Sequence, residues 1–328
     1  MNRTSFAAVA VFVALLAGTQ TNAAAQTYTT FDPPNSGSTA PDKVYPSGKV
    51  VGIFFPTSNN IVAGFIRDLK GAFTVVQYPG TGNSTVKVRI AGSGLAGEYR
   101  DSGNVYHGFI RSSSGVYIGF DAPGAVNTHV VDANAKGQVV GYYSMLPNDA
   151  GPLNGYIRDV NGNITTFTPQ AGSMVYPVAI NSTGGVVGQF RTTSYHGFIR
   201  AANGVITTFT DGPHTTHVTG WNASGQIVGW SQPGGGYLRD TLGNFTNIQV
   251  IGPRTYPQGI NDAGQVVGYF LNSRSRKIGF FRRADGTIVQ LNPPGGAGNI
   301  TLTSISLGFI TGSYGGTTSH GVLITGVH

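Results

Sequence analysis

The chain has 328 residues, and only 10% of them are Asp, Glu, Lys or Arg, against about 25% in an average soluble protein. It contains 50 glycines and no cysteine, so disulfide bonds, cysteine-ligated metal centres and thiol catalysis are excluded. The formal net charge is +7, and the abundance of Gly, Phe and Tyr is typical of a turn-rich β-protein.

The first 25 residues have the pattern of a secretory signal peptide. Arg3 provides a basic start, residues 6–18 form a short apolar run, and three alanines at 23–25 precede Gln26. The apolar run is too short to span a bilayer. We therefore expect residues 1–25 to be removed and residues 26–328 to form one domain. The protein is expected to be secreted, to the periplasm or the cell exterior, without membrane insertion.

Two phrases alternate along the mature chain. One resembles VVGYF at 266–270, and the other resembles GFIR at 108–111. Each occurs seven times, with a period of about 43 residues. Self-similarity at this period is typical of a propeller with one unit per blade or of an open solenoid.

Residues 255–294 show one complete unit. Four short segments of alternating character, TYPQGI, QVVGYF, IGFFRR and TIVQLN, are separated by Gly-bearing turns. Such a pattern predicts one antiparallel blade of four strands. The chain begins partway through a unit, with strands expected at 27–31 and 49–55, and ends on a third strand at 320–325.

The offset ends favour a closed ring over an open solenoid. We predict an all-β fold: a seven-bladed β-propeller of four-stranded blades, closed by one blade shared between the N- and C-termini. Closure leaves no exposed sheet edge, whereas an open solenoid needs atypical capping units. The last strand is assigned to a unit whose other strands lie at the N-terminus.

The paired phrases resemble the repeats of the bacterial extracellular HAF family across nearly the whole mature chain. The resemblance rests on GINDAGQVVGYF at 259–270 and on HGFIR at 107–111 and 196–200. This sequence has His-Gly-Phe where the family's name implies His-Ala-Phe. The resemblance implies an exported β-repeat protein and supplies no catalytic residues.

Residues that recur at one position of many units are expected to stabilise the blades. His107, His196 and His320 all precede the glycine of the third strand. The arginines that end the third strand follow the same logic: Arg67, Arg111, Arg158, Arg200 and Arg239. Because these repeated positions supply much of the positive charge, we expect no nucleic-acid partner, which requires clustered cations.

Residues that vary between units at the mouth of the channel are better functional candidates. The first strand of each unit is predicted to be innermost, with its N-terminal end on the face that carries the long loops 144–153 and 271–277. One equivalent position there holds His129, Tyr176, His217 and Tyr256, with Ala40, Val86 and Ile300 in the remaining units. His214 and Arg254 lie just before this ring, and Arg89 and Asp132 lie three residues beyond it. The ring either packs between blades or forms a ligand site.

The chemistry available favours binding over catalysis. Glu98 is the only glutamate and most aspartates fall in turns, so a glycosidase with two carboxylates is poorly supported. Neither a metal site nor a cofactor is expected. We predict a monomer that binds a polysaccharide or cell-surface glycan at the channel mouth. The assigned ligand-binding residues are His129, Tyr176, His214, Asp132 and Arg89.

Two alternatives stay open. The first is a polysaccharide lyase that performs β-elimination on a uronate-containing glycan. His217 and Tyr256 would then move protons and Arg254 would stabilise the enolate-like intermediate. The second is a scaffold that holds a protein partner on the broad propeller face.

Overall fold

A computed structural model describes residues 26–328 apart from 59–60, 81, 83, 251–253, 293–298 and 328. The predicted signal peptide at residues 1–25 lies outside the described residues. Strands form almost all the regular structure of the described part, with one short 3-10 turn, η1 (Pro147–Asp149). No helix in this part is long and apolar enough to cross a membrane.

The strands group into sheets that follow the chain. The first sheets consist of β2 (Ser36–Val44), β3 (Val50–Pro56), β4 (Ala63–Arg67) and β5 (Phe73–Val76), then β6 (Ser84–Ala91), β7 (Gly94–Arg100), β8 (Tyr106–Arg111) and β9 (Tyr117–Phe120). Next come β10 (Asn127–Ala133), β11 (Val139–Ser144), β12 (Leu153–Arg158) and β13 (Ile164–Phe167), then β14 (Met174–Ile180), β15 (Val186–Arg191), β16 (Tyr195–Arg200) and β17 (Ile206–Phe209). The later sheets consist of β18 (Thr215–Trp221), β19 (Ile227–Gln232), β20 (Gly235–Arg239) and β21 (Phe245–Ile248), then β22 (Thr255–Ile260), β23 (Val266–Leu271), β24 (Lys277–Arg282) and β25 (Ile288–Leu291). The last comprises β26 (Asn299–Ser306), β27 (Phe309–Gly315), β28 (Ser319–Thr325) and β1 (Thr27–Phe31).

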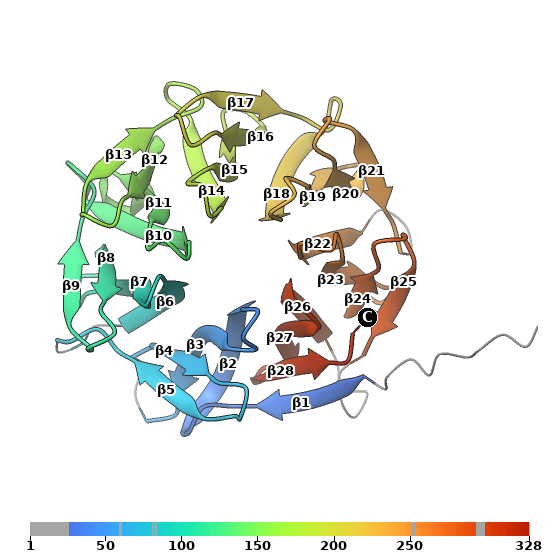
Figure 1. Cartoon of the computed structure of the whole chain (residues 1–328), viewed down its shortest axis with the longest axis horizontal. Coiled ribbons are helices and arrows are strands. Elements are labelled where there is room, and N and C mark those ends of the chain that lie inside the picture. Colours follow the sequence, from blue (N-terminus) through green and yellow to red (C-terminus); the bar gives the residue numbers. More distant parts are fainter. Residues whose placement is uncertain are drawn as a thin grey trace, which may run out of the picture.

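The sheets stand around a central axis, and the first strand of each lies nearest that axis (Figure 1). Strands then follow in chain order toward the outside, each antiparallel to the one before it, except that β1 is the outermost strand of the last sheet. One parallel pair, Leu153 with Met174, links the sheet of β10–β13 to the sheet of β14–β17. The prediction of an all-β propeller built from four-stranded sheets is confirmed, with the first strand innermost as expected.

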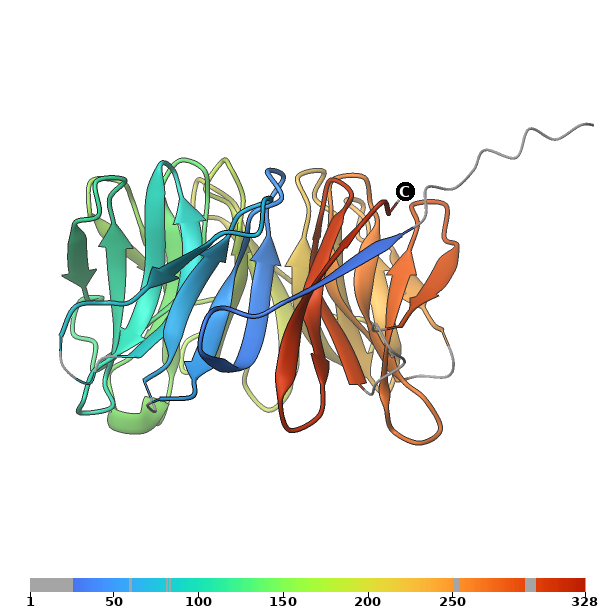
Figure 2. The ribbon, with the colours of Figure 1, turned by 90° about the horizontal axis from the view of Figure 1, so that it is seen from below.

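The two ends of the described chain share a sheet. β1 pairs antiparallel with β28, from Thr27 opposite Thr325 to Phe31 opposite Gly321 (Figure 2). The prediction assigned most of this unit to the N-terminus, and that division is wrong: β26, β27 and β28 come from the C-terminus and β1 is the outermost strand. The repeated phrases mark the second and third strands, so they could not locate the fourth.

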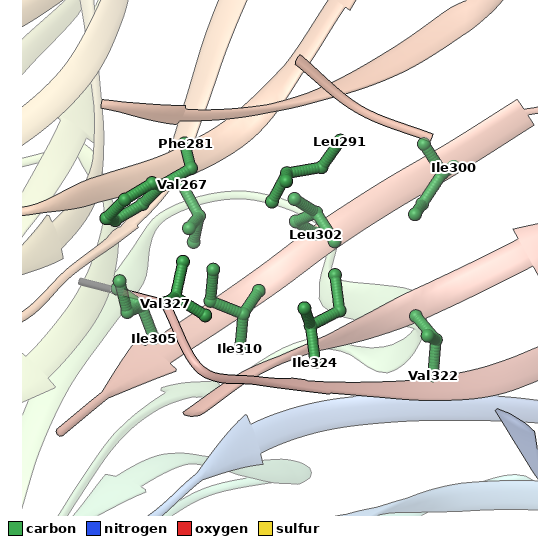
Figure 3. Packing of buried hydrophobic residues seen from close by; sticks show 10 residues of the cluster. All are labelled: Val267, Phe281, Leu291, Ile300, Leu302, Ile305, Ile310, Val322, Ile324 and Val327. Carbon is green, nitrogen blue, oxygen red and sulfur yellow. The ribbon is translucent and has the colours of Figure 1, made fainter. Parts of the chain in front are cut away.

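Apolar side chains fill the space between neighbouring sheets. At the contact between the sheet of β22–β25 and the last sheet, a fully apolar cluster joins the two (Figure 3). Its members are Val267, Phe281, Leu291, Ile300, Leu302, Ile305, Ile310, Val322, Ile324 and Val327.

In four sheets the repeated glycine of the third strand lies beneath an aromatic ring from the fourth strand. Gly108 is opposite Phe120 in the ladder, and Gly321 is opposite Phe31. A Cβ atom on either glycine would overlap the ring that covers it. In the other three sheets, aliphatic side chains and backbone atoms fill the same space, so the glycine repeats because none of these positions has room for a side chain.

In four sheets the repeated arginine at the end of the third strand covers an aromatic ring of the preceding sheet, whereas Arg111 covers Tyr117 of its own sheet. The guanidinium carbon of Arg158 lies 5.0 Å from the ring centroid of Phe120, and that of Arg239 lies 4.7 Å from Phe209. Arg67 covers Phe31 in the same way, at 5.0 Å. These cation–π contacts join one sheet to the next and explain why the arginine recurs.

Two of the repeated histidines bind an aspartate that follows the fourth strand. His107 Nδ1 lies 2.9 Å from Asp121, and His320 Nδ1 lies 2.7 Å from Asp32. His196 instead has Nε2 3.2 Å from Ser194 Oγ. The His320–Asp32 pair joins residues 288 positions apart in the chain, so it ties the last strand to the segment after β1.

Replacing Phe31 with Ala should lower the free energy of unfolding by about 3–5 kcal/mol. Phe31 is 6% exposed, packs edge-on against Phe65, and lies under Arg67, so its removal leaves a cavity between the first and last sheets. Chemical denaturation followed by circular dichroism measures the change.

Phe167→Ala is the matched control, because Phe167 covers Gly155 and lies under Arg200 in the same arrangement. The two substitutions should cost similar amounts. A neutral Phe31→Ala beside a costly Phe167→Ala would show that β1 is not docked in solution.

Candidate functional site

Aromatic side chains near the N-terminal ends of the inner strands form a continuous chain of ring contacts. The centroid of His129 lies 4.6 Å from Tyr106 and 4.5 Å from Tyr142, and Tyr142 reaches Tyr176 at 5.7 Å. The chain of contacts continues to Tyr269 through the later sheets. We call this set the aromatic arc: Tyr106, His129, Tyr142, Tyr176, Tyr195, His217, Trp230, Tyr256 and Tyr269.

The arc arises from one repeated position and its partner across the ladder. His129 is opposite Tyr142, His217 is opposite Trp230, and Tyr256 is opposite Tyr269. Cross-strand aromatic pairs of this kind stabilise a sheet as well as forming a surface. The arc lies toward the face with η1 and the loop between β23 and β24, the lower face in Figure 2. We call it the loop face.

The sequence alignment brought four arc residues together correctly but slipped by one residue in two sheets. The position equivalent to His129 is Lys87, not Val86, because Lys87 pairs with Glu98 after an early bulge in β6. In β26 it is Thr301, not Ile300, because Thr301 pairs with Ser313. The arc therefore gives way to a lysine and a threonine, not to apolar side chains.

His129 is the most enclosed member of the arc. It is 6% exposed, with Nδ1 3.3 Å from Glu98 and Nε2 3.0 Å from Asp149. Burial alone would lower the pKa of His129, but the two carboxylates outweigh it and raise that pKa. His129 therefore packs between two sheets in an environment that favours its charged form. Among the described residues, no group of three acidic or imidazole side chains could hold a metal ion.

His217 has the opposite environment. Its ring stacks on Trp230 at 3.8 Å and lies 4.3 Å from Tyr195. Burial lowers the pKa of His217, and none of the described ion pairs involves it. This imidazole is half-buried and neutral near pH 7, in a wall of aromatic rings.

The three residues assigned to a lyase do not form one contact group. Trp230 stacks on His217 and meets Tyr256 edge-on at 5.4 Å, so the indole lies between them. Arg254 is exposed, with Nη1 3.4 Å from Ser275 Oγ. His214 lines a separate cavity of about 210 Å³ with Asp211 and other residues of its own sheet.

Arg89 and Asp132 lie in the central channel, beyond the arc. They line a cavity of about 340 Å³ together with Asp42, Lys43 and Lys87. Lys43 Nζ lies 2.6 Å from Asp132, and Arg89 Nη1 lies 2.7 Å from Asp42. Burial alone would raise the pKa of Asp42, but Arg89 and Lys87 hold it well below its usual range. These ion pairs join β2, β6 and β10 around the axis.

A second cavity, which sequence reasoning missed, lies at the end of the arc. It has a volume of about 310 Å³, and hydroxyl, amide and glycine groups dominate its walls. The lining residues are Leu271, Ser275, Lys277, Asn299, Thr301, Ser313, Tyr314, Gly315, Gly316 and Ser319. We call it the hydroxyl pocket. Its walls come from the β23–β24 loop and the last sheet, and the run SRSRK was the only sequence signal.

No protein-family model matches the sequence, and neither does any curated protein. Among solved structures, a catalytically inactive variant of virginiamycin B lyase from Staphylococcus aureus with quinupristin is similar. Its sequence identity is 14%, the TM-score is 0.65, and the match covers 92% of this chain and 99% of that one. The β-propeller domain of the trilobed protease from Pyrococcus furiosus has 11% identity, a TM-score of 0.64, and coverage of 88% and 95%. The fold is a β-propeller. At such low identity the likeness shows the fold alone.

The two arc histidines should titrate on opposite sides of the usual pKa of about 6.5. The carboxylates around His129 favour its charged form, so the stability they contribute is present below pH 6.5 and lost as pH rises through the raised pKa. Burial of His217 favours its neutral form, so that contribution is present above pH 6.5 and lost as pH falls through the lowered pKa.

Imidazole proton NMR across this pH range measures both titrations. The variants His129→Gln and His217→Phe identify the two signals. Titration of His129 below His217 would contradict the assigned environments.

Proposed function

We propose that this protein binds a glycan along the aromatic arc. The observation that carries the proposal is the continuous series of ring contacts from Tyr106 to Tyr269. Apart from the buried His129, the rings are only partly buried, so their edges and faces remain available at the loop face. Aromatic rings offer large apolar surfaces, and the phenol and indole groups add hydrogen bonds, as a sugar requires.

The length of the arc favours a polymer over a single small molecule. Its members come from β8, β10, β11, β14, β16, β18, β19, β22 and β23, which span much of the ring (Figure 1). The hydroxyl pocket beyond Tyr269 adds side-chain hydroxyls and the Asn299 amide. A chain of several sugar units could contact both, whereas one small ligand would leave most of the arc unused.

We also propose that seven four-stranded blades form a closed ring that holds the arc rigid. Support comes from the end strands, which repeat the contacts of the interior ones. Phe31 covers Gly321 as Phe120 covers Gly108, and His320 binds Asp32 as His107 binds Asp121. Arg67 then joins this blade to the next one through Phe31.

The proposed setting is outside the inner membrane. The signal-peptide pattern of residues 1–25 and the HAF-like repeats support secretion of a single-domain protein. A cysteine-free ring held by side-chain contacts needs no oxidative folding step in that compartment. A glycan of a cell surface or cell wall is the partner that this setting offers.

His217 supports polysaccharide β-elimination as the second candidate. A neutral imidazole can take the proton next to a uronate carboxylate, and the electron pair then expels the glycosidic oxygen and leaves a carbon–carbon double bond. Tyr256 would donate a proton to that oxygen, and Arg254 would stabilise the intermediate. Incubation with uronate polymers should generate ultraviolet absorbance that His217→Phe abolishes; no absorbance from the wild type would eliminate this candidate.

Binding on the arc should change the fluorescence of Trp230 and leave that of Trp221 unchanged. The chain has two tryptophans; Trp230 belongs to the arc, whereas Trp221 lines the central channel. In Trp221→Phe, added polysaccharide should alter the emission of Trp230. Trp230→Phe, which keeps a stacking ring, should still bind but give no emission change.

Trp230→Ala should weaken binding roughly tenfold, because the loss of one aromatic contact of about 1.4 kcal/mol corresponds to that factor. Thermal unfolding shows whether each variant keeps its fold. Emission changes confined to Trp221 would place the ligand in the channel and contradict the proposal.

A further inference from the structure

Four cations lie together at one end of the aromatic arc. Arg254 precedes β22, Arg274 and Arg276 belong to the loop between β23 and β24, and Lys277 is the first residue of β24. Among the described ion pairs, none includes any of these four residues. We call this group the basic loop.

The repeated arginines and the channel cations have structural partners, whereas no described ion pair or cation–π contact involves Arg274 or Arg276. The repeated arginines cover aromatic rings, mostly between sheets, and the channel cations pair with Asp42 and Asp132. The corresponding loop after β15 carries no charge beyond Arg191, the last residue of that strand, and the one after β27 carries no charge. The charges of the basic loop are therefore not part of the repeat, and non-repeated residues at the loop face are where we expect a functional site.

Hydrogen bonds fix the basic loop in one conformation. Asn272 Oδ1 accepts the backbone N–H groups of Arg274 at 2.9 Å and Arg276 at 3.0 Å. The Arg254 carbonyl accepts the N–H of Leu271 at 3.0 Å, which ties the first arginine to the loop. The exposed charges of Arg274 and Arg276 thus project from an ordered support.

Lys277 connects the basic loop to both neighbouring sites. Its ammonium lies 4.6 Å from the ring centroid of Tyr269, the last member of the arc. Its backbone N–H donates to Asn299 Oδ1 at 2.8 Å, and both residues line the hydroxyl pocket. A ligand lying on Tyr269 can therefore reach the pocket and the cations together.

We propose that the basic loop and the hydroxyl pocket bind an acidic group of the glycan, a carboxylate or a sulfate ester. This inference rests on the proposed glycan-binding function and specifies its ligand as an acidic polysaccharide. Arginine donates paired hydrogen bonds to such planar or tetrahedral anions, and the pocket hydroxyls supply further donors. At the other end of the arc, Glu98 and Asp149 bind His129. The acidic group therefore belongs at the Lys277 end.

The test compares polymers that differ in their acidic groups, by affinity electrophoresis at increasing salt. Polygalacturonate carries carboxylates, dextran sulfate carries sulfate esters, dextran is neutral, and single-stranded DNA is a polyanion without a polysaccharide backbone. The wild type should bind one or both acidic polysaccharides most tightly. Arg274→Gln/Arg276→Gln should reduce that affinity roughly tenfold or more and flatten its salt dependence.

Lys49→Gln/Lys136→Gln is the matched control, since it removes two exposed cations from turns on the opposite face. It should leave binding unchanged, which separates the local effect from net charge. The more responsive acidic polymer identifies carboxylate or sulfate as the recognised group. Equal loss of affinity in both double variants, or DNA binding as tight as that of the acidic polysaccharides, would overturn the proposal.

Emission from Trp230 in Trp221→Phe separates this inference from the proposed function. If dextran and the acidic polymers change that emission equally, and the arginine substitutions have no effect, then glycan binding stands and acid selectivity is refuted. If no polysaccharide changes the emission, both proposals fail.

Discussion

The architecture depends on the contacts that join neighbouring sheets around the axis, and one of them recurs at four junctions. There a fourth-strand ring covers the third-strand glycine of its own sheet and faces the arginine of the next one, as Phe120 does with Gly108 and Arg158. This arrangement fills the space between two twisted sheets with an aromatic ring and a guanidinium. The glycine, the ring and the arginine therefore recur together, and the blade repeats because its junction repeats.

This constraint separates structural side chains from functional ones. The residues at the repeated His, Gly and Arg positions make contacts within and between sheets. Their recurrence is therefore explained by the structure and says little about activity. The first-strand position of His129 and its equivalents, near the loop face, makes none of these repeated contacts and is free to vary. Aromatic residues occupy it over a large part of the ring, and Ala40, Lys87 and Thr301 occupy it elsewhere.

Sequence periodicity was sufficient to predict an all-β propeller of four-stranded sheets, although only two strands of each unit carry a recurring phrase. The glycine-centred phrases identified the second and third strands, and their spacing implied four strands per unit. The same periodicity failed where a strand has an irregularity: the bulge between Thr85 and Lys87 occurs two residue pairs earlier in the ladder than the bulge in β10, so Lys87 was overlooked. Bulges change register without changing composition, so a repeat alignment cannot detect them.

The candidate site was less predictable because its parts come from different sheets. His129 and His217 occupy equivalent positions, yet the first meets Glu98 and Asp149 while the second meets Trp230. Trp230 is the cross-strand neighbour of His217 in its own sheet. The carboxylates around His129 do not follow from the position itself, since Glu98 comes from the preceding sheet and Asp149 from a loop. Asp132 similarly binds Lys43 from a strand 89 positions earlier in the sequence.

The two ends of the aromatic arc differ in their electrostatic environment. Near β10, two carboxylates bind the imidazole of His129 and favour its charged form, and near β24 Lys277 lies over Tyr269 without an acidic partner among the described ion pairs. The rings between them present apolar and hydroxyl groups of little net charge. A polymer lying along the arc would thus meet a different electrostatic environment at each end. A repeat fold can achieve such asymmetry only through its loops and its variable positions, because the residues at the junctions between sheets are constrained by the contacts that hold the ring together.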